Sequence, residues 1–368
     1  MVKRRGMAAL ALGMGLVIAA VGCAEDDDFL IGGKRPSSQR TPKPSGSGGT
    51  GGNGGSGTDV GGGIGTGDKP VATPTPAPTP TPTPAPTPPP PGTLVHSYPL
   101  QFDSPQGIAF DSAGNAWIAC YGDGVMSSVV TRMDPSGQLL LEPPAGIAPS
   151  QVLVDASGNA WVANSPSNTV TKILPDGTST SYEVGASPRG MAINPQGTEL
   201  WIASQTLVAL DLATQATRSV VPVAASGIAF HGDKAWVGYA ASSSVGVYSM
   251  SGALEREITL TSTPRLVRAS ADTVWVLTST GGMRIDPETD AKRAITDGST
   301  HDLAIDKDGG AWVSYSFPSA VVKRFRANGD FADNLTIGLA PHGLAFHPAT
   351  GYLWVTDRTG KKVNVFVP

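Results

Sequence analysis

Polar side chains with binding chemistry recur at equivalent places along the second part of the chain. Each stands at the start of a short apolar segment such as "GIAFD" or "GLAFH". In chain order they are Gln106, Ser150, Arg189, Ser226, Arg265, His301 and His342. Guanidinium groups bind oxyanions, and imidazoles donate or accept hydrogen bonds. If the fold gathers these positions, they predict a site for an anionic or polyhydroxylated ligand, such as a sugar acid, a glycan or an acidic peptide. The alternative is a solvated funnel of polar residues.

Seven tryptophans mark the elements that would position these residues. Each follows one of the apolar segments, in several repeats after a tight-turn sequence such as "SAGN" or "KDGG". They recur every 35 to 44 residues, at Trp117, Trp161, Trp201, Trp236, Trp275, Trp312 and Trp354. A third apolar segment, a second turn and a fourth segment follow. Four short strands at a period of about 40 residues are typical of propeller blades.

The repeat predicts an all-β fold, a seven-bladed propeller of four-stranded blades. One blade cannot bury both of its faces, so we expect each tryptophan to fill the space between neighbouring blades. The last repeat ends at Pro368 one strand short, while a surplus strand, Leu94–Leu100, precedes the first repeat. Adding this strand to the last blade would close the ring and remove two exposed sheet edges. His231 and His347 are expected at surface turns.

These repeats resemble those of a known group of propellers. The pattern "P-x-G-I-A-x-D-x-x-G-N-x-W-V-A" and the segment "APHGLAFHPATGYLWVTD" (residues 340–357) look like the streptogramin (virginiamycin B) lyases and the related NHL and gluconolactonase-like propellers. The resemblance covers about residues 94–368. It implies the fold, and for the lyases it implies catalytic His and Glu residues and Mg²⁺ at the channel mouth. Because this architecture carries many activities, the fold alone does not give the function.

The lyase pattern is only partly present. His342, in "PHG", matches the family histidine directly, and His301 matches by register. The third residue after each tryptophan, where the resemblance implies Glu, is Cys120, Asn164, Ser204, Tyr239, Thr278, Tyr315 or Asp357. Only Asp357 is a carboxylate there, and Mg²⁺ requires oxygen ligands. We therefore expect a binding propeller without metal or cofactor. In the alternative, a carbon–oxygen lyase or lactonase-like hydrolase, His301, His342 and Asp357 are the catalytic candidates and Mg²⁺ the cofactor.

Residues 1–22 resemble a bacterial lipoprotein signal peptide. Lys3, Arg4 and Arg5 precede an apolar stretch, and "AAVGC" places small residues before Cys23. The resemblance implies cleavage and lipidation of Cys23, and hence an extracytoplasmic protein anchored to a membrane. Ala24 follows the cysteine instead of Asp, which implies the outer membrane if the cell is Gram-negative. The alternative is an ordinary secretory signal and a released protein.

Residues 23–92 have the composition of a disordered tether. The run "SGSGGTGGNGGSG" favours a flexible coil, whereas "TPTPAPTPTPTPAPTPPPP" favours stiff polyproline II helix. The sequence thus predicts three parts: a signal peptide at 1–22, a tether at 23–92 and a propeller at 93–368.

Charge and cysteine content restrict the partners. The formal net charge is −4 and the pI is about 5.7, which argues against binding to nucleic acid. If Cys23 carries lipid, Cys120 has no partner for a disulfide, and its apolar surroundings predict a buried, inert thiol. We expect a monomer that binds an anionic or carbohydrate ligand or a protein partner.

Overall fold

The computed structural model describes residues 88–122, 128–317, 320–337 and 340–368. The chain divides into two units, Met1–Thr81 and Pro82–Pro368, and every described residue belongs to the second. The predicted signal peptide, Cys23 and the tether up to residue 87 lie outside the described residues. Within the described part, no helix has the length and apolar character needed to cross a bilayer.

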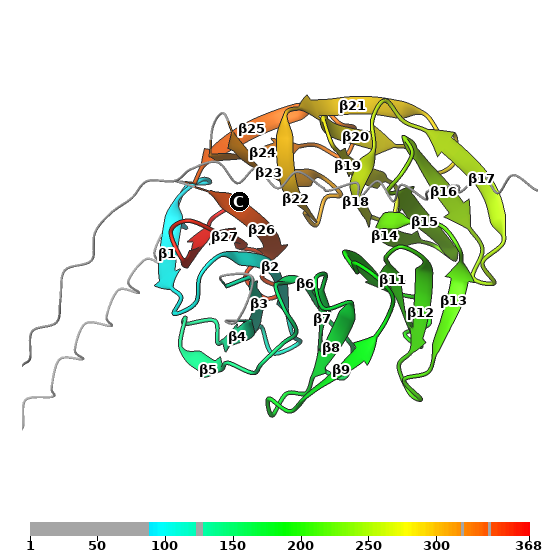
Figure 1. The fold of residues 1–368 in the computed structure, drawn as a ribbon. Coiled ribbons are helices and arrows are strands. Elements are labelled where there is room, and N and C mark those ends of the chain that lie inside the picture. Colours follow the sequence, from blue (N-terminus) through cyan, green and yellow to red (C-terminus); the bar gives the residue numbers. More distant parts are fainter. Residues whose placement is uncertain (1–87, 123–127, 318–319, 338–339) are drawn as a thin grey trace, which may run out of the picture. The chain divides into compact units, whose positions relative to one another are not determined.

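In the described part of the chain, twenty-eight strands form seven antiparallel sheets of four, arranged as blades around a ring, which confirms the predicted propeller (Figure 1). Blade 1 contains β2 (Pro105–Phe110), β3 (Ala116–Cys120), β4 (Val129–Met133) and β5 (Leu139–Leu141). Blade 2 contains β6 (Pro149–Val154), β7 (Ala160–Asn164), β8 (Thr169–Ile173) and β9 (Ser179–Glu183). Blade 3 contains β10 (Gly190–Ile193), β11 (Glu199–Ala203), β12 (Leu207–Asp211) and β13 (Thr217–Val221).

The remaining blades repeat this order. Blade 4 contains β14 (Ala225–His231), β15 (Lys234–Tyr239), β16 (Ser244–Tyr248) and β17 (Leu254–Thr259). Blade 5 contains β18 (Pro264–Ala269), β19 (Val274–Thr278), β20 (Gly281–Ile285) and β21 (Lys292–Asp297). Blade 6 contains β22 (Ser299–Ile305), β23 (Ala311–Phe317), β24 (Val321–Phe325) and β25 (Phe331–Thr336). Blade 7 contains β26 (Pro341–Phe346), β27 (Leu353–Asp357), β28 (Lys362–Phe366) and, from the other end of the propeller, β1 (Leu94–Pro99).

The ring closes as the sequence predicts. Strand β1 pairs antiparallel with β28, from Leu94 opposite Phe366 to Pro99 opposite Lys362. In Figure 1 the cyan strand β1 lies beside the red end of the chain. The first strand of each blade contacts the first strand of the next, and β26 of blade 7 contacts β2 of blade 1. These seven inner strands therefore surround the centre of the ring.

The hydrophobic core is divided into seven clusters, each shared by two neighbouring blades. Every cluster contains one of the tryptophans, whose exposed fractions are 0–4%. This confirms that the tryptophans fill the spaces between blades. Cys120 is also buried, and burial raises the pKa of its thiol to about 11. The predicted buried thiol is therefore confirmed.

Polar turns anchor several of the tryptophan rings. The indole N–H of Trp161 donates to Asp155 at 2.8 Å, and that of Trp312 donates to Asp306 at 3.1 Å. His347 holds the equivalent place in blade 7, and the expectation that it is exposed is wrong. It is only 4% exposed, because its ring lies against Trp354 and meets Phe110 of blade 1 edge-on. His231 is half-buried and its Nε2 contacts the Ala271 carbonyl at 2.8 Å.

Candidate functional site

Backbone pairing confirms the alignment of the seven polar positions. The residue opposite each tryptophan on the inner strand is Ala109, Leu153, Ala192, Ala229, Arg268, Ala304 or Ala345. The polar residue stands three places earlier in every blade. Gln106, Ser150, Arg189, Ser226, Arg265, His301 and His342 therefore occupy one end of the inner strands, which we call the channel mouth.

His301 and His342 come together at this mouth from adjacent blades. Their ring centroids are 4.8 Å apart and their planes are tilted by 32°. Both residues are half-buried. His301 Nε2 and His342 Nδ1 are shielded from water and have no hydrogen-bond partner among the described residues. A buried polar atom without a partner is costly. Other described residues also have such atoms, among them His347, but here two rings that carry them lie against each other at the mouth.

The electrostatics of the pair keep both imidazoles neutral. Burial lowers the pKa of His301 to about 4, and the charges of Arg265 and Arg358 act in the same direction. Burial lowers the pKa of His342 to about 3, with further contributions from His301, Arg358 and Arg265. Both guanidinium-bearing residues are exposed. The mouth at blades 5 to 7 therefore combines two positive charges with two neutral rings.

Sequence reasoning missed Asp302, the carboxylate nearest to this pair in the chain. Asp302 follows His301 at a place where Gly107, Gly190, Gly227 and Gly343 stand in other blades. Its side chain is 15% exposed. Burial raises the pKa of the carboxyl, although Arg268 and two backbone N–H groups oppose the shift. The sequence could have revealed Asp302, because the aligned position directly after the polar residue holds glycine in most blades and an acid only in blade 6.

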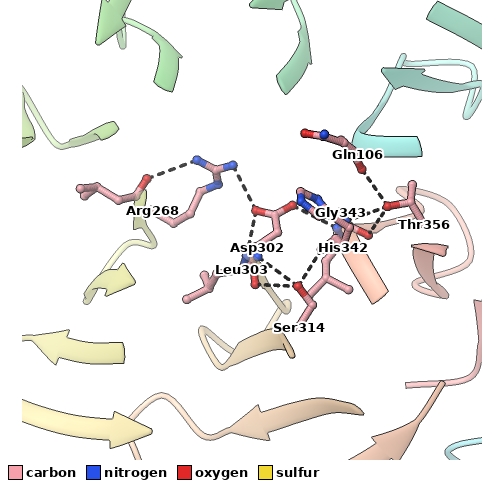
Figure 2. Close-up of polar contacts among 10 residues, drawn as sticks. Gln106, Arg268, Asp302, Leu303, Ser314, His342, Gly343 and Thr356 are labelled. Atoms are coloured by element: carbon pink, nitrogen blue, oxygen red, sulfur yellow. Dashed lines mark hydrogen bonds and ion pairs between the residues drawn. The ribbon is translucent and has the colours of Figure 1, made fainter. Parts of the chain in front are cut away.

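Asp302 belongs to a chain of polar contacts that crosses four blades (Figure 2). It pairs with Arg268 of blade 5 at 3.5 Å and accepts a hydrogen bond from the Leu344 N–H of blade 7 at 3.0 Å. Ser314 donates its hydroxyl to the His342 carbonyl at 2.6 Å. Thr356 donates to the Gln106 carbonyl of blade 1 at 2.7 Å. The backbone that carries His342 is thus fixed on both sides.

The other predicted residues are less closely associated. Gln106 is buried, and its backbone carbonyl accepts the hydrogen bond that ties it to blade 7. Arg189 is exposed on blade 3, and Ser226 of blade 4 lies between it and Arg265 around the ring. Arg358 lies outside the seven aligned positions and directly follows Asp357 in the sequence. Its positive charge helps to lower the pKa of His301 and of His342.

The two mouth carboxylates have little capacity left for a metal. Asp357 is 1% exposed and its Oδ1 accepts hydrogen bonds from the Gly360 N–H at 2.9 Å and the Ala340 N–H at 3.3 Å. Asp302 is paired with Arg268. In the described ranges, no three His, Cys, Asp or Glu side chains gather in a way that could hold a metal ion. These residues, with Arg265 and Arg358 beside them, do not fit Mg²⁺.

Solved structures share this architecture. A streptogramin B lyase has a TM-score of 0.63 at 17% identity, with 74% of this chain and 96% of that chain covered. The fold is that of the streptogramin B lyases. Virginiamycin B lyase from Staphylococcus aureus has a TM-score of 0.64 at 16% identity, with 74% and 98% covered. Hydrazine synthase from Kuenenia stuttgartiensis has a TM-score of 0.64 at 13% identity, with 73% and 97% covered.

Sequence comparisons add nothing to this likeness. No protein-family model matches the chain, and no curated protein matches it. At such low identities the likeness establishes the fold alone. It confirms the resemblance to streptogramin lyase propellers at that level. The site residues and their roles stay predictions.

Proposed function

We propose that the protein is an extracytoplasmic lipoprotein that displays a binding propeller on a tether, without catalytic activity. The ligand would bind at the channel mouth of blades 5 to 7. One observation carries this proposal: two adjacent imidazoles keep ring nitrogens that have no partner among the described residues, and two exposed guanidiniums lie close enough to lower their pKa values. Residues that serve stability alone normally satisfy such atoms, so their retention supports a binding role.

The protonation state supports binding more than catalysis. A general base is most effective when its pKa lies near the working pH. Here the pKa values of His301 and His342 are about 4 and about 3, which makes both rings weak bases at neutral pH. The carboxylates of Asp302 and Asp357 are held by backbone N–H groups. The mouth is therefore better suited to holding a ligand than to removing a proton from it.

A ligand panel tests the binding proposal. Thermal unfolding of the full chain would be followed with sugar acids, neutral glycans and acidic peptides, for wild type and for His342→Ala. We expect a compound that stabilises the wild type to lose its effect in the variant. Arg293→Gln, on the outer strand β21, is the control and should respond like wild type. If every stabilising compound acts equally on His342→Ala, the ligand binds elsewhere and the proposal is wrong.

The anchor requires a separate test. The proposal places lipid on Cys23, so Cys23→Ser should move the protein from the membrane fraction to the soluble fraction. Incorporation of a labelled fatty acid in wild type but not in Cys23→Ser would support the anchor directly. Equal fractionation of the two proteins would contradict it and favour the secreted alternative.

A streptogramin lyase-like or lactonase-like enzyme is the second candidate. His342 in the "PHG" motif and the shared fold favour it. Incubation with a streptogramin B and with simple lactones, with and without Mg²⁺, would be followed by mass spectrometry. Ring opening that disappears in His342→Ala would establish catalysis at the mouth and overturn the non-catalytic proposal.

A further inference from the structure

The hydrogen-bonding character of the mouth follows from which ring nitrogens are buried. His301 Nε2 and His342 Nδ1 have no partner among the described residues. A neutral imidazole carries one N–H and one bare nitrogen. A buried N–H without an acceptor is rarer than an under-satisfied acceptor, so the bare nitrogen belongs at the buried position. The N–H then sits on His301 Nδ1 and on His342 Nε2, and each ring offers a donor.

Among the described residues, the charged groups around the pair leave no free carboxylate to accept from these donors. Arg265 on β18 and Arg358 after β27 supply positive charge. Asp302 on β22 is paired with Arg268 and accepts from Leu303 and Leu344. Asp357 on β27 accepts from Ala340 and Gly360, and Lys361 beyond it pairs with Asp103. What remains at this part of the mouth is two guanidiniums and two imidazole donors.

We propose that this part of the mouth binds an oxyanion, a carboxylate or a phosphate group of the ligand, through Arg265, Arg358 and the two neutral histidines. The inference rests on the proposed function and names its ligand class. Guanidiniums bind oxyanions with charge-assisted, often bidentate hydrogen bonds, and the imidazoles complete the ligand's shell without adding charge. A cation is disfavoured because both arginines repel it. A neutral glycan would leave the arginines without a counter-charge.

Calorimetry on the full chain at low ionic strength tests the inference, because salt screens exposed charges. The probes are inorganic phosphate and glucuronate, with glucose as the uncharged analogue. We expect both anions to bind and glucose not to bind. Arg265→Gln with Arg358→Gln should weaken anion binding about tenfold or more, since it removes charge-assisted donors. Arg293→Gln with Arg326→Gln removes the same charge from the outer rim and should change affinity less than about twofold.

A pH series identifies the state of the histidines. If the rings bind while neutral, the affinity for glucuronate should be nearly constant between about pH 7.5 and pH 5.5. A rise of about tenfold over that range would mean that imidazolium does the binding, and would overturn this part of the inference. Absence of binding by either anion at about 10 mM would overturn the oxyanion assignment. If glucose or a neutral glycan binds and depends on His342, the mouth remains a binding site and the oxyanion assignment alone fails.

Discussion

Asp302 occupies a position that four other blades fill with glycine, and the reason is steric. A Cβ on Gly107 would lie 2.8 Å from the Ser150 carbonyl, and one on Gly190 would lie 2.8 Å from the Gly227 Cα. At these glycines the inner strands of neighbouring blades approach too closely for a side chain, whereas blades 2 and 5 hold Gln151 and Leu266 at the same position. Asp302 is accommodated because its carboxylate reaches the Leu344 N–H of the next blade.

Removing this carboxylate should destabilise the protein. In Asp302→Ala, the Leu344 N–H and the guanidinium of Arg268 lose a buried partner, which costs about 1–3 kcal/mol of the free energy of unfolding. Urea unfolding followed by tryptophan fluorescence measures the loss. Asp308→Ala removes an exposed acid paired with Lys307 and should change stability by less than about 0.5 kcal/mol. Equal effects of the two substitutions would show that the inter-blade contact contributes nothing.

The histidine pair should make stability depend on pH. The pKa values of His301 and His342 in the folded protein, about 4 and about 3, lie below the ordinary value of 6.5. Below about pH 6.5 the unfolded chain therefore binds more protons, and the free energy of unfolding falls as the pH decreases towards 4. His301→Gln with His342→Gln should flatten this fall in urea titrations between about pH 7 and pH 4. Asp302, whose raised pKa acts in the opposite sense, is retained in both proteins. Parallel pH profiles would contradict the prediction.

Among the elements, the strands could be predicted well and the mouth only in part. The tryptophans recur because each must fill one inter-blade space, so their spacing predicts all seven blades. The mouth depends on neighbours from different blades, and a single repeat does not contain that information. Arg358 of blade 7 helps to lower the pKa of His301 in blade 6, although Arg358 is not one of the seven aligned polar residues. His347 is buried because Phe110 of blade 1 covers it, a contact that no local pattern predicts.

Strand β1 should be essential to the stability of blade 7. Tyr98 packs against Trp354 with ring centroids 5.5 Å apart, and Leu100 is only 8% exposed. Deletion of residues 94–100 removes these contacts and exposes the edge of β28. We expect a loss of about 3 kcal/mol or more, comparable to truncating a large buried side chain, measured by circular-dichroism melting. Deletion of residues 45–51, in the glycine-rich segment, is the control of equal length and should leave the melt unchanged. An unchanged melt for the first deletion would contradict closure by β1.

For the whole molecule, the exchange of one strand joins the two ends of the propeller without a covalent bond. The Gly92 N–H donates to the Val367 carbonyl at 2.8 Å, and the Val367 N–H donates to the Thr93 carbonyl at 3.0 Å. These ends are close enough for a short glycine–serine linker to join them. Circular permutation then allows the place of the chain opening to be varied while the composition stays the same.

Two permutants of residues 92–368 separate the contribution of strand exchange from that of blade packing. Opening between Asp308 and Gly309, in the turn between β22 and β23, divides blade 6 so that the two chain ends again share a sheet. Opening between Thr261 and Ser262, after β17, leaves every blade continuous, and only side-chain packing then holds the first blade to the last. Because separating the ends must break a sheet only in the first permutant, we expect it to unfold at higher urea concentration and more slowly than the second. If the second permutant is equally resistant, the inter-blade clusters close the ring by themselves, and the exchanged strand adds nothing to its stability.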